Sequence, residues 1–427
     1  MAYKNIQLLT TILLALLLLT TVCTQALESK NQNRFLETHT TLQKNHNDIV
    51  FDQKISFLMK LAGFSSLSAS IIQGDEIIWS EAYGYYDRSE KKQATTDTIY
   101  LLASITKTVV GTALMQLYEQ NLCDLDDDVN NYLPFELRNP HFPNDTITIK
   151  MLLSHTSSLN LNTQNEYYWF NFSSDPPLDF FPYPYLKEFL VPQGRYYQDD
   201  VWSQQYRPGE YAMYANVGYD LLVYLIEIIS GNCFLEYCDT NIFLPLGMSN
   251  TSFNLSRLNI DQVAIPYQRY MGRYFTIDEL SFFWFGKNYT PPDKYWRPRF
   301  YPAGGLYSTV DDLSRFLLAH MNQGALQNIS ILKPETIALM HQIQPENRIG
   351  YGLGWMHTKI SPRIIASGHG GDLFGVSTWM LYNNETDIGV IYLANGNPSY
   401  GRLPRLARML KSLFVYCLFT KQCLGQT

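Results

Sequence analysis

The stretch Tyr100-Leu-Leu-Ala-Ser-Ile-Thr-Lys-Thr-Val-Val-Gly-Thr-Ala-Leu-Met-Gln-Leu117 is where the interpretation of the chain begins. Residues 98–102 form a short β-branched and aromatic run, which favours a strand. From Ile105 onward the apolar residues recur at helical spacing, so a helix follows at once. Ser104 and Lys107 therefore stand three residues apart on one face, at the start of that helix.

Such a pair is suited to nucleophilic chemistry. A serine hydroxyl is a weak nucleophile and needs a neighbouring base, and a helix N-terminus offers free N–H groups to developing negative charge. The spacing alone is weak evidence, because Ser89/Lys92 and Ser330/Lys333 repeat it in a charged turn and a loop. A serine that only caps the helix is the structural alternative. Of the three pairs in the sequence, however, only Ser104/Lys107 is followed by a long apolar helix.

The composition indicates a globular protein. The chain has 427 residues, of which 46% are hydrophobic and 17% charged, enough for one large domain or two smaller ones. Acidic residues give a formal net charge of −7, and no cluster of Lys and Arg is present, so nucleic acid is not expected as a partner. No Cys/His cluster has zinc spacing, so we expect no metal and no cofactor.

The N-terminus is typical of a secretory signal. In residues 1–26, Lys4 precedes the apolar run 8–19, and Thr24-Gln-Ala26 is a plausible cleavage site. The alternative is an uncleaved anchor over residues 6–22, which would make a membrane a partner. The chain is thus expected outside the cell or in the secretory lumen, with 27–48 as a loose leader. Glycosylation is expected at the sequons of Asn144, Asn171, Asn250, Asn254, Asn288, Asn328 and Asn384.

The cysteines allow several pairings. Cys23 falls in the signal, and an odd number remains, which permits two disulfides and one free thiol. These remaining cysteines are Cys123, Cys233, Cys238, Cys417 and Cys423.

Strands are predicted at both ends of the chain and helices in the middle. The runs 67–73 and 76–83 are joined at Gly74-Asp75, a hairpin signal. The later strand-like runs are 351–358, 363–367, 376–382 and 388–394, and the predicted helices include 55–61, 146–153, 218–229, 310–320 and 403–419. This order predicts an α+β domain over 49–420, with one antiparallel sheet from N- and C-terminal strands flanked by helices, and a mostly helical insertion over about 105–340.

Three other features have both a functional and a structural interpretation. The aromatic segments 160–205 and 267–301 are long enough to form a lid or the rim of a binding site. The acidic loop 124–132 lacks the spacing of an EF-hand and is interpreted as a solvated turn. His155 could be catalytic, but a histidine that holds a loop by hydrogen bonds is favoured.

Two further motifs complete the pattern. Tyr214-Ala-Asn216 precedes the predicted helix at 218–229, and His369-Gly-Gly371 lies beside a C-terminal strand. With the Ser/Lys pair, in this order, they resemble the serine β-lactamase and penicillin-binding-protein family, most closely its class C branch of DD-peptidases, esterases and D-aminopeptidases. The resemblance covers about residues 50–415. It is supported by Leu152-Leu-Ser-His-Thr-Ser157, Pro208-Gly209 and Pro302-Ala-Gly-Gly-Leu306.

The chain also departs from the family pattern. His369-Gly-Gly371 replaces the usual Lys-Thr-Gly, which argues against β-lactamase activity because a lysine helps to hold a substrate carboxylate. Ser158 stands where the family usually has glycine.

The resemblance implies acyl transfer through a covalent acyl-Ser104 on a small-molecule or peptide-like ester or amide. Lys107 would accept the serine proton or keep a phenolate charged, and Tyr214 would shuttle the proton. Asn216 would hydrogen-bond the substrate or Lys107, and His369 would polarise the region near the leaving group. Gly370 and Gly371 would let the substrate approach the strand closely. The backbone N–H groups of Ser104 and Asp372 would form an oxyanion hole. The alternative is a catalytically inactive member that binds a ligand or serves as a scaffold.

Overall fold

The computed structural model describes residues 46–160, 183–276, 279, 295, 301–344, 349–400 and 404–421. The chain divides into two compact units, Met1–Ile49 and Val50–Thr427. The fold and the site belong to the second unit.

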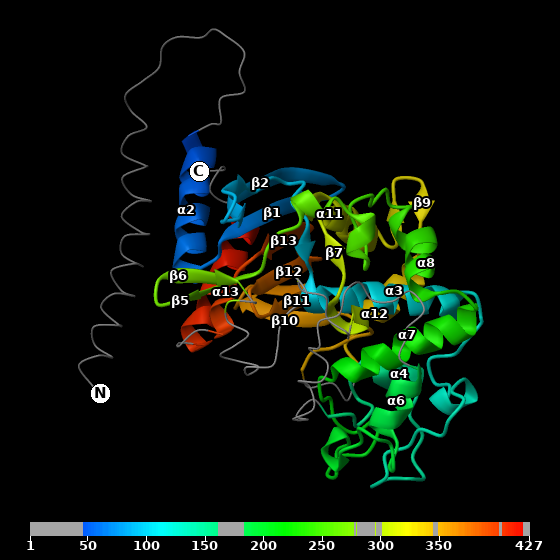
Figure 1. The fold of residues 1–427 in the computed structure, drawn as a ribbon. Helices are drawn as coiled ribbons and strands as arrows, with labels where there is room; N and C mark the ends of the chain where they lie inside the picture. The colour runs from blue at the N-terminus through cyan, green and yellow to red at the C-terminus, as the bar shows by residue number, and fades with distance from the viewer. Residues whose placement is uncertain are drawn as a thin grey trace, which may run out of the picture. The chain divides into compact units, whose positions relative to one another are not determined.

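An antiparallel sheet of seven strands organises this unit, in the order β10-β11-β12-β13-β1-β2-β3 (Figure 1). The N-terminal strands are β1 (Ser66–Gln73), β2 (Glu76–Asp87) and β3 (Lys92–Gln93). The C-terminal strands are β10 (Met356–Ser361), β11 (Ile364–Leu373), β12 (Val376–Asn383) and β13 (Ile388–Ala394). The two groups meet where β1 pairs with β13, from Leu67 opposite Ala394 to Gln73 opposite Ile388.

Local chemistry explains the central strands. Gly74 adopts a φ of +56° in the β1–β2 turn, a conformation that costs glycine little. In β1, side chains alternate between the two faces of the sheet. Leu67, Ala69 and Ile71 belong to one apolar cluster, whereas the Ser70 hydroxyl lies 2.8 Å from the Ser314 hydroxyl on the other face. That small polar pair lets a helix pack closely on the sheet.

Helices cover both faces. The cluster on the first face joins α2 (His46–Ala62) and α13 (Pro404–Phe419) to the sheet, through Phe51, Ile55 and Phe414 among others. On the second face lies α11 (Val310–Met321), whose first turn is capped because the Thr309 hydroxyl accepts a hydrogen bond from the Asp312 N–H.

The segment between the N- and C-terminal strands carries most of the remaining helices. They are α3 (Thr106–Glu119), α4 (Ile149–Leu153), α6 (Tyr183–Leu190), α7 (Asn216–Ser230), α8 (Phe234–Cys238), α10 (Tyr301–Gly304) and α12 (Pro334–His341). Short two-stranded sheets join β4 (Tyr100–Leu101) to β7 (Tyr307–Ser308), β5 (Tyr267–Tyr270) to β6 (Arg273–Thr276), and β8 (Ala325–Leu326) to β9 (Ile329–Ser330). The predicted α+β class, with a sheet drawn from both ends of the chain, is confirmed.

Several predicted boundaries were wrong. Helix α2 is longer than 55–61, and α4 starts at Ile149, after the cap at Thr148 rather than at residue 146. Strand β10 starts at Met356, five residues later than predicted, and β11 extends to Leu373, so His369-Gly-Gly371 lies within a strand and not beside one. Residues 161–182 and most of 277–300, in the two aromatic segments, lie outside the described residues.

Among the described cysteines, Cys123, Cys233 and Cys238 are free thiols. No disulfide therefore forms among them, and Cys423 lies outside the described part. Across that same part of the chain, no single helix has the length and apolar character needed to cross a bilayer; only the pair Asn216–Ser230 and Phe234–Phe243, bent by 79°, meets those criteria together.

Candidate active site

Ser104 lies in a single 3₁₀ turn, Ala103–Ile105, between β4 and α3. Ala103 has a φ of +50°, an uncommon conformation for a residue other than glycine. The turn is held by the Thr106 hydroxyl, which donates to the Ala103 carbonyl at 2.7 Å. Such backbone strain is common where a side chain must be presented to a ligand. Ser104 remains partly accessible although its neighbours in the turn are buried.

The turn rests directly on strand β11. A Cβ atom placed on Gly371 would lie 2.2 Å from the Leu102 carbonyl oxygen and 3.1 Å from the Ala103 Cβ. The Thr378 hydroxyl of β12 donates to the same Leu102 oxygen at 2.6 Å. Glycine at 371 is thus required for the sheet and the Ser104 turn to approach this closely.

Lys107 is completely buried and reaches Ser104 from the first turn of α3. Its Nζ donates to the Ser104 Oγ at 3.2 Å, to the Asn216 Oδ1 at 2.9 Å and to the Ala303 carbonyl at 2.6 Å. An ammonium group has three donors, and these three oxygens fix its position. Asn216, at the start of α7, and α10 thereby hold the amine against the serine.

Tyr214 approaches the serine from the loop before α7. Its hydroxyl lies 2.8 Å from the Ser104 Oγ, and its ring centroid is 4.9 Å from the Lys107 Nζ. The serine oxygen is therefore within hydrogen-bonding distance of both groups that could exchange a proton with it. This distance meets the geometric requirement for a general base.

His155 fixes the loop that carries Tyr214. Its Nδ1 accepts from the Ala215 N–H at 3.2 Å, and its carbonyl accepts from the Met213 N–H at 2.8 Å. Its ring lies 4.4 Å, centroid to centroid, from that of Tyr214. Burial lowers the pKa of His155 well below its ordinary value, and the Lys107 charge lowers it further, so the imidazole is neutral. The favoured interpretation, a histidine that holds a loop, is confirmed.

Ser158, which replaces the usual glycine, keeps a glycine-like backbone. Its φ is +62°, in the left-handed region. Its hydroxyl accepts from the Asn139 amide at 3.0 Å, and its carbonyl accepts from the Ser203 N–H at 2.8 Å. One side-chain hydrogen bond and one backbone hydrogen bond of Ser158 therefore hold the turn after His155.

His369 lies on β11 but is buried and does not contact solvent. Its Nδ1 is 2.6 Å from the Gly370 carbonyl, an acceptor only, so Nδ1 carries the proton and Nε2 accepts from the Tyr351 hydroxyl. Burial, with a smaller effect of the Lys107 charge, lowers the pKa of His369 to about 3. The ring is neutral, and its centroid lies 6.4 Å from that of Tyr214.

Asp372 presents its side chain to the other face of the sheet. The carboxylate accepts from the Asn397 amide at 2.9 Å and pairs with Lys411 of α13. Burial lowers the pKa of Lys411, although the Asp372 charge opposes that shift. These contacts fix the end of β11 from the other face of the sheet, while the strand backbone continues past the Ser104 turn.

The edge of β11 beside the serine is open among the described residues. The ladder with β10 ends at the pair of Met356 and Gly368, so 369–373 have no strand partner on that side. The structure therefore brings together Ser104, Lys107, Tyr214 and Asn216 by direct hydrogen bonds, and places Gly371 beneath them. His369 connects to this group through its neighbour Tyr351, and the Asp372 side chain contacts Asn397 and Lys411 instead of the serine.

Sequence reasoning missed two groups in this site. Tyr351 was assigned to a strand, and the Ala303 carbonyl was part of a quoted turn with no role attached. The motif Tyr351-Gly-Leu-Gly-Trp355 contained the missing signal, because paired glycines mark a turn rather than a central strand.

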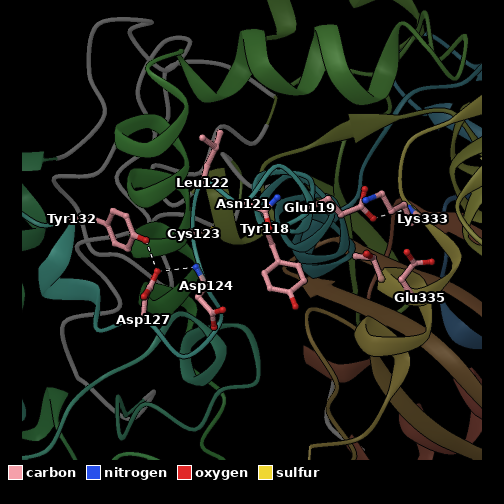
Figure 2. A pocket seen from close by; sticks show the side chains of 11 residues that line it. Tyr118, Glu119, Asn121, Leu122, Cys123, Asp124, Asp127, Tyr132, Lys333 and Glu335 are labelled. Carbon is pink, nitrogen blue, oxygen red and sulfur yellow. Dashed lines mark hydrogen bonds between the residues drawn. The ribbon is translucent and has the colours of Figure 1, made fainter.

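A separate pocket of about 530 Å³ lies at the far end of α3 (Figure 2). Its walls include Tyr118, Glu119 and Lys333. Some of its polar groups are engaged with one another: the Asp127 carboxylate accepts from the Tyr132 hydroxyl, and the Glu119 carboxylate accepts from the Lys333 backbone N–H. Helix α3 separates it from Ser104 by about 20 Å, at 1.5 Å per residue, so it is not part of this site.

Fold and site together define a class of protein, the serine hydrolases built on the β-lactamase and transpeptidase fold. The chain belongs to the family described as Beta-lactamase, whose sequence model matches residues 51–412.

Similar proteins agree with this assignment. Penicillin-binding protein 4* of Bacillus subtilis strain 168 is 27% identical over 332 residues, which are 76% of this chain and 66% of that protein. The octameric penicillin-binding protein homologue from Pyrococcus abyssi has a TM-score of 0.64 at 24% identity, covering 86% of this chain and 77% of that one. The D-amino acid amidase from Ochrobactrum anthropi SV3, complexed with L-phenylalanine amide, has a TM-score of 0.67 at 19% identity, covering 87% and 99%. The chain spans 62–67% of the length of the curated relatives it matches.

Proposed function

We propose that this protein hydrolyses an ester or amide bond through a covalent acyl-Ser104 intermediate. One observation carries the proposal: the Ser104 Oγ lies 3.2 Å from the Lys107 Nζ and 2.8 Å from the Tyr214 hydroxyl. A serine becomes a useful nucleophile when a positioned group can take its proton as the new bond forms.

In the proposed first step, the Ser104 Oγ attacks the carbonyl carbon and its proton passes to the Tyr214 phenolate, which the Lys107 ammonium stabilises. The backbone N–H groups of Ser104 and Asp372 stabilise the oxyanion. The bond to the leaving group then breaks, and the same proton is delivered to the departing oxygen or nitrogen. In the second step water attacks the acyl-enzyme, releases the acid and restores the serine hydroxyl.

We further propose that preferred substrates carry no free carboxylate next to the scissile bond. His369 occupies the position of the family lysine, and its imidazole is neutral because burial lowers its pKa to about 3. A neutral, buried ring offers a carboxylate no charge. The D-amino acid amidase among the similar structures acts, by its name, on an amide, which supports an ester or amide substrate over a β-lactam.

The test combines a covalent probe with a substrate panel. A fluorophosphonate should label Ser104, as located by peptide mass spectrometry, and Ser104→Ala should abolish both labelling and turnover. We expect turnover of p-nitrophenyl esters or D-amino acid amides and much slower turnover of nitrocefin. Labelling that persists in Ser104→Ala refutes the nucleophile. If the folded wild type neither turns over a substrate nor reacts with the probe, the ligand-binding or scaffold alternative is favoured.

The cellular location is a further part of the proposal. Residues 1–26 support entry into the secretory pathway, with either cleavage or retention of the apolar run. N-terminal sequencing of the protein from its native source distinguishes the two outcomes.

A further inference from the structure

The turn between β5 and β6 has an unusual composition. Tyr270 pairs with Arg273, so Met271 and Gly272 form a two-residue turn, with φ values of +48° and +85°. Two positive φ angles define a type I′ turn, where Asn, Asp or Gly is favoured at the first position. Here that position holds methionine, whose side chain is 80% exposed. The sequence thus accepts both backbone strain and an exposed apolar side chain at one point.

The hairpin lies beside the C-terminal end of α2. Arg269 donates to the Lys60 carbonyl at 2.8 Å, and the Tyr274 hydroxyl donates to the Phe64 carbonyl at 3.1 Å. Figure 1 shows β5 and β6 next to the end of α2. On that end, Phe57 and Leu61 stand four residues apart, hence on one helical face, and both are about half exposed.

These elements form one surface, which we call the cationic apolar patch. It consists of Phe57, Lys60, Leu61, Arg269, Tyr270, Met271 and Arg273, all exposed. Neither 55–62 nor 267–276 contains an acidic residue, although the whole chain has a net charge of −7. A local excess of cations around apolar side chains is therefore a property of this surface, not of the protein at large.

We propose that the cationic apolar patch docks onto an anionic lipid surface. Apolar side chains that enter the headgroup region, with Lys and Arg beside them and an aromatic ring at the boundary, are the features of interfacial membrane binding. The cations attract anionic lipids over a short range, and Met271 and Leu61 supply the apolar contact.

The order of segments along the chain is compatible with binding of the patch to a lipid surface. Residues 6–22 are apolar, and residues 23–45 separate them from the start of α2. A linker of that length reaches on the order of 75 Å when fully extended, so retention of the N-terminal run would still allow the patch to meet the same bilayer. The chain is therefore long enough for the N-terminal apolar run and the cationic apolar patch to bind the same bilayer at once.

The experiment uses the full-length chain, so that the N-terminal run is present in every sample. Vesicles of phosphatidylcholine with phosphatidylserine, or of phosphatidylcholine alone, are added, and hydrogen exchange is followed in the peptides that cover 55–62 and 267–276. We expect both peptides to exchange at least about tenfold more slowly with the anionic vesicles, and the protection to weaken as salt is added.

Two variants provide the comparison. Met271→Asn combined with Leu61→Gln removes the apolar contacts while placing asparagine where the turn favours it, so the fold should be kept. Ile329→Gln, on the exposed β9, is the control, because Ile329 is about as exposed as Leu61 but lies outside the patch. The double variant should lose the vesicle-induced protection, and the control should retain it, with thermal unfolding unchanged in both.

Three results would overturn the proposal. The first is vesicle binding without protection of the two peptides, which would assign attachment to the N-terminal run alone. The second is protection that survives in the double variant. The third is protection that appears without vesicles as protein concentration rises, which would identify a second copy of the chain as the occupant.

Discussion

Replacement of Gly371 by alanine should test how tightly the reactive serine depends on the sheet beneath it. The new Cβ would lie 2.2 Å from both the Leu102 carbonyl oxygen and the Thr378 hydroxyl oxygen. Ordinary contacts of this kind exceed 3 Å, so the Ser104 turn and β11 must separate by on the order of 1 Å. Such a shift also lengthens the 2.6 Å hydrogen bond from Thr378 to Leu102.

The shift should affect catalysis more than folding. A misplacement of about 1 Å can cost a factor of roughly 10² in rate, and overpacking typically destabilises by about 1–3 kcal/mol. We therefore expect kcat for the best ester or amide substrate to fall about 100-fold in Gly371→Ala. The probe-labelling rate of Ser104 should fall in parallel, because both report the same acylation step.

Gly389→Ala is the matched control. Its Cβ would lie 2.8 Å from the Met321 sulfur and 3.1 Å from Leu317, so it also overpacks the sheet but contacts α11 and not the Ser104 turn. Urea unfolding of both variants measures the loss of stability, and active-site titration corrects kcat for folded protein. If the two variants lose equal activity per folded molecule, or if Gly371→Ala keeps the wild-type kcat, the reasoning is refuted.

Three further predictions concern buried groups. His155→Phe keeps an aromatic ring but leaves the buried Ala215 N–H without its acceptor, so the free energy of unfolding should fall by about 1–3 kcal/mol and kcat should decrease, as urea melts and steady-state assays will show. Burial raises the pKa of Asp220 to about 8, so its folded form holds a proton that the unfolded form has lost; this group alone should lower stability by about 1.4 kcal/mol per pH unit as the pH rises from 4 to 8, and the difference between the unfolding free energies of wild type and Asp220→Asn, measured across that range, should show this slope. Burial lowers the pKa of both His320 and His369 to about 3; below pH 6.5 the unfolded chain binds more protons, so each should reduce stability by about 1.4 kcal/mol per unit of acidification, and the absence of such a fall in pH-dependent unfolding would contradict their burial as neutral rings.

Local motifs predicted much of this site because their geometry is set by neighbouring residues. Ser104 and Lys107 share a helical face by spacing alone, and the contact between them follows. The glycine at 371 and the asparagine at 216 were identified by the order of motifs, and the structure places both near the serine. None of these inferences required knowledge of which strands pair.

The parts that were missed depend on long-range packing. That His155 would accept a hydrogen bond from the backbone of Ala215 could not be read from spacing, because 60 residues separate them. The two carboxylate oxygens of Asp220 are buried with no hydrogen-bond partner among the described residues. In sequence that aspartate was one polar residue in a strongly apolar helix, with nothing to show which way it faced.

The start of β10 was predicted five residues too early, and this error hid two features of the site. A strand starting at Tyr351 would have placed that tyrosine in the ladder and extended the pairing along β11. Instead Gly354 adopts a φ of +84°, and a Cβ on Gly352 would lie 2.2 Å from the Met340 carbonyl, so the chain turns until Met356. The turn lets the Tyr351 hydroxyl reach His369 and leaves the edge of β11 beyond Gly368 without a strand partner in the described chain. The same pair of glycines therefore supplies the neighbour of His369 and opens the backbone edge beside Ser104, where an extended substrate could pair with the strand.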